Sequence, residues 1–210
     1  MHVLGLTGSI GMGKSTVANA FRSSGIAVYD ADSTVHELMS VGGAAVEEVG
    51  KVFPTAIKDG SVDRQALGEI VYDDRKALEQ LEGILHPLAR DVQFKFLQVN
   101  ANKREKLVVL DIPLLYEKHL DLFCDTVIVV TAPYFIQKQR VLGRPGMTKK
   151  RFYNILKQQM PNGEKKKRAD FIIQTGLNKR EALSKINRII TETRREGPFL
   201  WSRHRIQRNA

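Results

Sequence analysis

The chain has 210 residues, of which 42% are hydrophobic and 27% charged, a composition typical of globular proteins and not of disordered or fibrous ones. It contains no apolar run of roughly 18 or more residues, and its N-terminus leads directly into a predicted strand. We therefore expect neither a membrane span nor a cleavable signal. The only cysteine, Cys124, excludes an intrachain disulfide and is expected to fill a small space in the core. These features predict a cytoplasmic protein.

The net charge of +10 is concentrated in one part of the chain. Between Ile136 and Arg168 there are 11 Lys or Arg residues and a single acid, Glu164, whereas the remainder holds 22 bases and 22 acids. A basic excess confined to one short stretch suits a flap that grips phosphate at least as well as a surface that tracks nucleic acid.

A glycine-rich motif follows the first predicted strand, His2–Thr7. The sequence GSIGMGKS at Gly8–Ser15 matches G-x-x-x-x-G-K-S, and a helix is predicted from Lys14 to Ser24. Such a loop turns successive N–H groups inward, and the helix adds the positive end of its dipole. Lys14 is expected to reach the β- and γ-phosphates and Ser15 to bind Mg²⁺. A turn that merely joins strand to helix is the alternative, but the full context favours a nucleoside triphosphate site.

Further apolar runs rich in β-branched residues predict strands buried on both faces of a parallel sheet, because polar and apolar residues do not alternate in them. Helical segments separate the runs, so the predicted fold class is α/β, a P-loop kinase-like doubly wound parallel sheet with helices on both faces. A last helix is predicted over Lys179–Arg195. The predicted strands after the first are Ile26–Asp30, Lys106–Ile112, Thr126–Thr131 and Asp170–Gln174.

Two insertions interrupt the predicted sheet. Residues 33–102 show helical periodicity and predict a helical arm, of the kind that often holds the acceptor substrate in small P-loop kinases. Residues 134–168, the basic segment, are predicted to form a lid of two helical pieces around the break at Gly143–Gly146. The predicted nucleotide-binding core then comprises residues 1–32, 103–133 and 169–200, and a tail covers residues 201–210.

Within the arm, helical periodicity is clearest over Ala77–Leu85 and Pro87–Val99, and Pro87 suits the first turn of a helix. From spacing alone, His86 reads as a packed or helix-starting residue, and Arg90 one turn later has no assigned role. The remaining histidines form no ligand cluster with one another or with the cysteine, so a zinc site is not predicted. They are His2, His36, His119 and His204.

Carboxylates follow two predicted strands, at the edge where open α/β sheets bind ligands. Asp30 and Asp32 would share a direction if the second strand continued, whereas a turn would separate their roles. A carboxylate here can orient or deprotonate an attacking hydroxyl, and Asp32 or Ser33 could instead cap the next helix. Asp111 ends the run KLVVLDI, and we expect it to support Mg²⁺, directly or through water, rather than to serve only as a turn residue before Pro113.

Arginines of the basic segment are candidates for binding phosphate. Arg140 and Arg144 lie four residues apart, on one helical face if the helix extends that far. Arginine forks bind phosphate oxygens in a bidentate way and offset charge in the transition state of phosphoryl transfer. A solvated face is the usual reading of a single arginine, but the uncompensated positive charge argues against it here. The run Lys165–Arg168 is interpreted as solvated surface.

Several motifs extend from the first strand to about Gly176: GLTGSIGMGKSTVA at Gly5–Ala18, Asp30–Asp32, LHP at Leu85–Pro87 with Arg90, DIPLLYE at Asp111–Glu117, and the stretch from QKQRVLGR through KQQMP to RADFIIQTG. Together they resemble the dephospho-CoA kinase family. Many kinases share the phosphate loop, whereas PLLYE, LHP and Gln159–Pro161 are far more discriminating.

The resemblance implies transfer of the ATP γ-phosphate to the ribose 3′-hydroxyl of dephospho-CoA, with Mg²⁺ as cofactor. Asp32 matches the family's base, Arg140 its lid arginine, and Thr7, His86 and Arg90 match positions near the acceptor. Many members carry asparagine where Thr175 stands, so the adenine contact is expected to differ if that position frames the base. The expected ATP-binding residues are Gly8, Gly11, Met12, Gly13, Lys14, Ser15, Thr16 and Arg144.

The expected partners are ATP and dephospho-CoA, with no nucleic acid and no membrane. Two other functions stay open. A P-loop kinase of another nucleoside or nucleotide acceptor would share the loop, lid and arm, although LHP and PLLYE argue against it. A nucleic-acid-stimulated P-loop ATPase would suit the positive charge, but basic stretches interleaved with aromatic residues are lacking. A GTPase switch lacks the N/T-K-x-D guanine signature.

Overall fold

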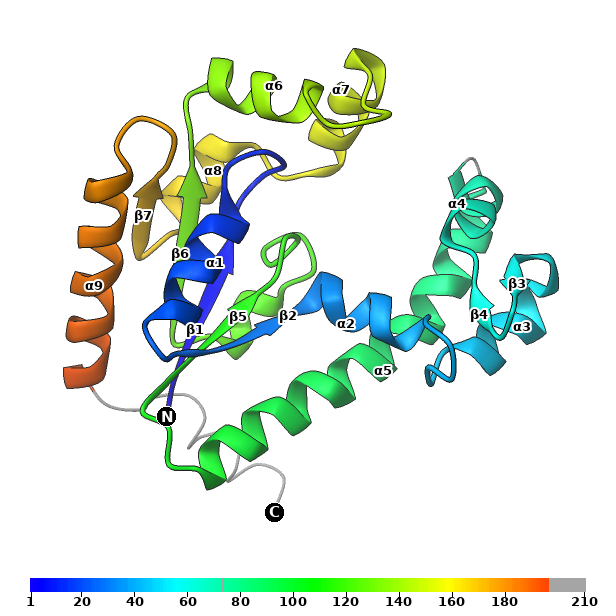
Figure 1. Cartoon of the computed structure of the whole chain (residues 1–210), viewed down its shortest axis with the longest axis horizontal. Helices are drawn as coiled ribbons and strands as arrows, with labels where there is room; N and C mark the ends of the chain where they lie inside the picture. The colour runs from blue at the N-terminus through cyan, green and yellow to red at the C-terminus, as the bar shows by residue number, and fades with distance from the viewer. Residues whose placement is uncertain (73, 197–210) are drawn as a thin grey trace. The chain divides into compact units, whose positions relative to one another are not determined.

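The computed structural model describes residues 1–72 and 74–196, and it divides into two compact units (Figure 1). The sheet unit comprises Met1–Tyr29 and the chain from Asn100 onward, and the helical unit comprises Asp30–Val99. The predicted arm had bounds of 33 and 102. The predicted tail, 201–210, and the last four residues of the predicted core, 197–200, lie outside the described residues.

The sheet unit is built on a five-stranded sheet with the order β2-β5-β1-β6-β7. Strand β1 pairs in parallel with β5 and β6, and β6 pairs in parallel with β7, so the predicted α/β class is confirmed. Every residue of the central strand β1 is buried, as the absence of alternation predicted. The strands are β1 His2–Thr7, β2 Ala27–Asp30, β5 Leu107–Asp111, β6 Thr126–Thr131 and β7 Phe171–Gln174.

Helices α1 (Lys14–Ser23) and α9 (Lys179–Glu196) lie beside each other and pack on the sheet (Figure 1). Their apolar side chains, including Phe21 and Ile186, join the buried residues of β1, β6 and β7 in one core. Gly25 follows α1 with φ +73°, the left-handed conformation that ends many helices. A short 3₁₀ helix, η2, spans Leu120–Phe123.

The basic segment contains three helices where the sequence predicted two, so that prediction was wrong. The predicted break at Gly143–Gly146 is present as a turn between α6 and α7. A second break follows α7, which ends at Gln158. Pro161 has an extended backbone (φ −53°, ψ 137°) and is the N-cap residue of the next helix. The three helices are α6 Tyr134–Leu142, α7 Lys149–Gln158 and α8 Asn162–Lys167.

The helical unit folds around its own apolar core, which includes Val49, Phe53 and Leu67. It also contains a two-stranded hairpin, which the sequence reasoning missed because each strand is two residues long and shows no alternation. The available signal was Asp59-Gly60, whose left-handed φ angles of 50° and 73° suit a tight hairpin turn. The elements are α2 Ala31–Leu38, α3 Val46–Val52, η1 Pro54–Ala56, β3 Ile57–Lys58, β4 Ser61–Val62, α4 Arg64–Tyr72 and α5 Arg75–Asn102.

Helix α5 runs without interruption through Pro87, so the prediction of two helices meeting there was wrong. An interior proline removes one backbone hydrogen bond and costs about 3 kcal/mol. Leu81 and Leu85 on one side of Pro87 and Leu88 on the other pack into the core of the helical unit. Burial of each such side chain contributes about 1.5–3 kcal/mol, which offsets the cost.

Cys124 is buried and free, as predicted, and it packs against the central strand. A Cβ placed on Gly5 would lie 2.7 Å from Cys124 Sγ and 3.0 Å from Leu115 Cδ2, so glycine gives the thiol its space. Burial raises the pKa of the Cys124 thiol, which therefore stays protonated and unreactive. None of the helices in the described part of the chain is both long and apolar enough to cross a membrane.

We expect Gly5→Ala to destabilise the protein by about 1–3 kcal/mol, because the added methyl group overlaps Cys124 Sγ. Combining it with Cys124→Ala should cost less than the sum of the two single changes, since the smaller side chain makes room. Urea unfolding of the four proteins measures this coupling, and strictly additive free energies would contradict the contact.

Candidate active site

The loop between β1 and α1 has a backbone that requires glycine at two positions. Gly11 and Gly13 have φ angles of 76° and 87°, in the left-handed region that other residues rarely adopt. A Cβ on Gly11 would lie 2.5 Å from Val141 Cγ2, and one on Gly13 would lie 2.6 Å from Thr175 Oγ1. Backbone conformation and lack of space therefore both restrict these positions to glycine, because side chains of α6 and of the residue after β7 lie where a Cβ would stand.

Lys14 and Asp111 form an ion pair at the end of this loop. Lys14 is the first residue of α1, and Asp111 is the last residue of β5, the strand beside β1. Lys14 Nζ donates to Asp111 Oδ1 at 2.5 Å, and the side chains are 14% and 2% exposed. A carboxylate buried this deeply requires a cation beside it. Two residues that the sequence predicted for the site therefore meet at one edge of the sheet.

The residues predicted to support Mg²⁺ have suitable chemistry. Ser15 is exposed in the first turn of α1, and Asp111 ends β5, the strand next to β1 in the sheet order. Hydroxyl and carboxylate oxygens are hard donors of the kind that Mg²⁺ prefers. The described residues contain no cluster of three or more His, Cys, Asp or Glu side chains that could hold a metal. Mg²⁺ commonly takes its other ligands from phosphate and water, so this donor set fits an ion bound together with a nucleotide.

Arg140 connects the basic segment to the phosphate loop. From α6, its Nη1 atom donates to Thr175 Oγ1 at 3.0 Å and to the Gly11 carbonyl at 3.4 Å. The Thr175 hydroxyl in turn donates to the Met12 carbonyl at 2.6 Å. Thr175, which the sequence related only to the adenine contact, therefore holds both the loop and the arginine.

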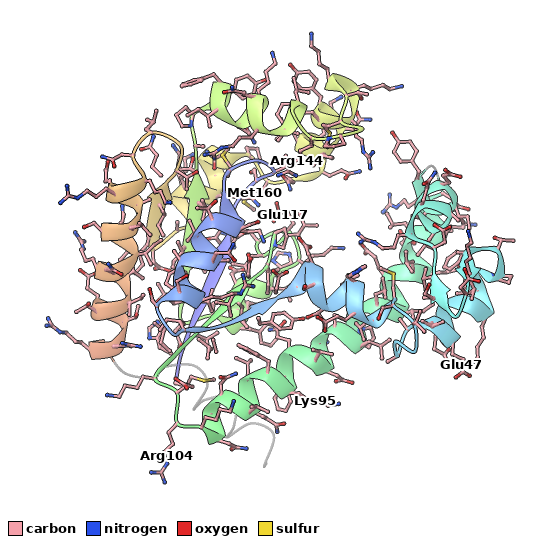
Figure 2. All side chains as sticks on the ribbon, in the orientation of Figure 1. Glu47, Lys95, Arg104, Glu117, Arg144 and Met160 are labelled. Atoms are coloured by element: carbon pink, nitrogen blue, oxygen red, sulfur yellow. The ribbon has the colours of Figure 1, made fainter. Side chains whose placement is uncertain are left out.

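Arg144 is placed differently from Arg140. Helix α6 ends at Leu142, so the two arginines do not share a helical face, contrary to the condition set by their spacing. Arg144 lies exposed on the turn that follows the helix (Figure 2). The structure thus brings one of the two predicted arginines to the loop.

Thr7 has a partner inside the sheet unit. Its hydroxyl, fully buried at the end of β1, donates to the Pro113 carbonyl at 2.9 Å. This bond joins the last residue of β1 to the segment that follows β5. The Thr7 oxygen retains only its acceptor capacity for any further contact.

Three predicted residues belong to the helical unit: Asp32, His86 and Arg90. Helix α2 begins directly after Asp30, whose side chain accepts the Ser33 N–H at 3.1 Å. The helix cap is thus Asp30, and the interpretation of Asp32 or Ser33 as the cap was wrong. Asp32 lies exposed in the first turn, and His86 and Arg90 lie exposed four residues apart on α5.

The sequence reasoning missed a buried ion pair between Glu117 and Lys165. Lys165 on α8 is fully buried, and its Nζ atom lies 2.8 Å from Glu117 Oε1 and 3.4 Å from the Pro113 carbonyl oxygen. Glu117 Oε1 also accepts the Met160 N–H at 2.8 Å (Figure 2). The available signal was the acid of PLLYE, which follows an apolar strand and needs a cation once buried.

The interpretation of Lys165–Arg168 as solvated surface was wrong for Lys165, whereas Arg168 is 42% exposed and also contacts the protein. Its guanidinium carbon lies 4.3 Å from the centroid of the Tyr116 ring, and Nη2 lies 2.9 Å from Asp121 Oδ2. The Tyr116 hydroxyl donates to the Arg168 carbonyl at 2.9 Å. Burial raises the pKa of Tyr116 to about 12, so its hydroxyl remains a donor at neutral pH.

Comparison with known proteins agrees with this geometry. Residues 2–181 match the family model described as CoaE, dephospho-CoA kinase. The chain belongs to the dephospho-CoA kinase family. It is accordingly an ATP-dependent kinase that phosphorylates dephospho-CoA to CoA, which confirms the function implied by the motifs.

Individual relatives cover most of the chain. It is 54% identical over 166 residues to a dephospho-CoA kinase of Paramagnetospirillum magneticum, which covers 79% of this chain and 78% of that protein. It is 48% identical over 194 residues to one of Mesorhizobium japonicum, with 92% and 98% covered. Among solved structures, TT1252 from Thermus thermophilus has a TM-score of 0.78 at 33% identity, and dephospho-CoA kinase from Campylobacter jejuni has 0.64 at 27%; each match covers 91% of this chain and 97% of the other.

We expect Glu117→Gln to destabilise the protein by about 3 kcal/mol or more, because Lys165 is left as a buried cation without a counter-charge. The double variant Glu117→Gln/Lys165→Met should recover most of that loss, since it removes both charges. Chemical denaturation provides the comparison. A double variant no more stable than Glu117→Gln would contradict the pairing.

Proposed function

We propose that the phosphate loop of the sheet unit binds the triphosphate of ATP, and that the helical unit binds dephospho-CoA and presents its ribose 3′-hydroxyl. The observation that carries this proposal is the convergence of Lys14, Asp111 and Arg140 on one glycine-rich loop. Two cations beside a glycine-rich loop and the N-terminus of a helix form a site for a polyanion.

In the sheet unit, Lys14 neutralises the β- and γ-phosphates and Arg140 stabilises charge on the migrating phosphoryl group. Ser15 and Asp111 would hold Mg²⁺, which when bound neutralises charge on the β- and γ-oxygens. The backbone of the loop and the start of α1 contact the phosphates, and exposed Arg144 adds positive charge. The proposed ATP-binding residues are Gly8, Gly11, Met12, Gly13, Lys14, Ser15, Thr16 and Arg144.

In the helical unit, Asp32 orients or deprotonates the 3′-hydroxyl. Its exposed carboxylate suits this role, because the capping role next to it is already taken by Asp30. His86 and Arg90 contact the acceptor, and from the sheet unit Thr7 contributes through its free lone pair. Residues 134–168 act as the lid that excludes water when both substrates are bound.

The distribution of the basic residues supports a small-molecule substrate over nucleic acid. Three cations that contribute to the local excess are engaged within the protein: Lys165 with Glu117, Arg168 with Asp121, and Lys167 with Glu164. The positive surface available to a long polyanion is therefore smaller than the sequence count indicates. The cytoplasm remains the predicted location.

The direct test is incubation with ATP, Mg²⁺ and dephospho-CoA, followed by mass detection of CoA and by product analysis that locates the new phosphate. The expected product carries it on the ribose 3′-oxygen. A phosphate on another hydroxyl would overturn the proposed orientation of the acceptor. Stimulation of ATP hydrolysis by DNA or RNA would favour the rival nucleic-acid-dependent ATPase.

We expect Arg140→Ala and Lys14→Ala to lower kcat by about 100-fold or more, because both cations act on charge that grows in the transition state. The matched control is Lys150→Ala, which removes an exposed cation from the same basic segment and should leave kcat unchanged. Steady-state kinetics measures the effect, and full turnover in either of the first two variants would refute its assignment.

Asp32→Asn should lower kcat by about 100-fold or more without changing stability, because the carboxylate that accepts the proton is lost. Asp30→Ala should do the opposite and cost about 1 kcal/mol of stability through loss of the α2 cap. Kinetics and thermal unfolding of the two variants separate the roles. An Asp32→Asn enzyme as active as the parent would exclude Asp32 as the base.

A further inference from the structure

The peptide of Ile10, in the middle of the phosphate loop, is held from both sides by glutamine side chains. Its N–H donates to Gln159 Oε1 at 3.0 Å, and its carbonyl accepts from Gln137 Nε2 at 2.8 Å. Gln137 lies on α6 and is 3% exposed, and Gln159 lies in the link between α7 and α8. Two parts of the basic segment, α6 and the link between α7 and α8, therefore contact one residue of the loop.

The chemistry of these contacts fixes the direction of each glutamine. A peptide offers one donor and one acceptor, so Gln159 must present its oxygen to Ile10 and Gln137 its nitrogen. Two bonds on opposite edges hold the plane of a peptide more firmly than one. The next residue is Gly11, which by itself places little restriction on its backbone. The turn is closed by the Met12 N–H, which donates to the Ser9 carbonyl at 3.2 Å, and the two glutamines hold the Ile10 peptide within that turn.

Gln159 is itself held in place by the residue that follows it. The Met160 N–H donates to Glu117 Oε1, and Glu117 pairs with the buried Lys165 (Figure 2). Glu117 stands in the segment after β5, the strand that ends in Asp111. The Ile10 peptide is thereby connected, through Gln159, Met160 and Glu117, to the segment that follows β5. The same strand ends in Asp111, the partner of Lys14.

We propose that Gln137 and Gln159 are positioning residues for ATP: they fix the Ile10 peptide and thereby the shape in which the loop from Gly11 to Lys14 contacts the phosphates. The Ile10 N–H is donated to Gln159 and contributes to the loop's shape, not to phosphate binding. This inference rests on the proposed binding of ATP at the loop.

The test uses the same substitutions at both positions. Gln→Met keeps the length of the side chain and removes the hydrogen bond, so both Met variants should lower kcat/KM for ATP by about 3- to 10-fold, the effect of one lost hydrogen bond. Gln159→Glu retains an acceptor and should restore activity relative to Gln159→Met. Gln137→Glu lacks a donor and should be impaired at least as much as Gln137→Met. Gln137 is buried and Gln159 only partly so, and an added charge therefore costs more at Gln137. Each Glu variant is compared with the Met variant at its own position, and rescue of Gln159→Met by Gln159→Glu reports the direction of that bond.

The matched control is Gln158→Met, an exposed neighbour at the end of α7 that should behave as the parent. The loss should fall on the KM for ATP, whereas the KM for dephospho-CoA at saturating ATP should not change. Amide exchange at Ile10 gives a readout without turnover: protection should be lost in Gln159→Met and kept in Gln159→Glu. Thermal midpoints are measured alongside.

Met variants with the parent's KM and kcat for ATP and only a lower thermal midpoint would show a merely structural role and overturn the inference. A Gln159→Glu enzyme no more active than Gln159→Met would also overturn it. Direct ATP binding separates this failure from that of the proposed site. If Lys14→Ala weakens binding and Gln159→Met does not, the positioning role alone fails; if neither variant weakens it, the site at the loop fails.

Discussion

The Lys14–Asp111 ion pair joins the start of α1 to the end of β5, and it fixes the glycine-rich loop relative to the sheet. The pair unites the last residue of one strand with the first residue after the loop of its neighbour, so the sheet pairing between β1 and β5 places the two charges. Asp111 is 2% exposed, and a carboxylate buried this deeply is stabilised by a cation beside it, which in this structure is Lys14. Lys14 is thus kept at the loop by the same strand edge that supplies the carboxylate.

Around that pair, polar contacts from distant parts of the chain control the backbone of the loop. Thr175 holds the Met12 carbonyl, Arg140 contacts the Gly11 carbonyl, and two glutamines hold Ile10. Glycines permit the loop's left-handed conformations but do not select them. The selecting groups come from α6, from the α7–α8 link and from the end of β7, so the basic segment shapes the loop besides supplying charge to it.

Local patterns were sufficient for much of the fold. The strands, the helix after the phosphate loop and the family motifs could be predicted because each depends on residues close together in the chain. The burial of Cys124 was predicted from its residue type and its place before an apolar strand. The count and bounds of the helices were less predictable: Pro87 lies inside α5 because leucines on both sides bury enough apolar surface, and Pro161 starts a helix within a segment of mostly polar residues. Tertiary packing decides whether a helix continues through or begins at such a proline, and the hydrophobic periodicity of the sequence carries no information about that packing.

The sequence by itself determined the α/β class, the phosphate loop and the kinase family, because these are recorded in contiguous motifs whose backbone needs are local. Only the tertiary structure decided which charged side chains are exposed and which are buried in ion pairs within the protein. Lys165 resembles its lysine neighbours in the sequence, yet it is fully buried against Glu117. Gln159 contacts a residue 149 positions away. The partner of such a side chain depends on which distant segments the fold brings into contact, and the spacing of residues along the sequence does not specify those contacts.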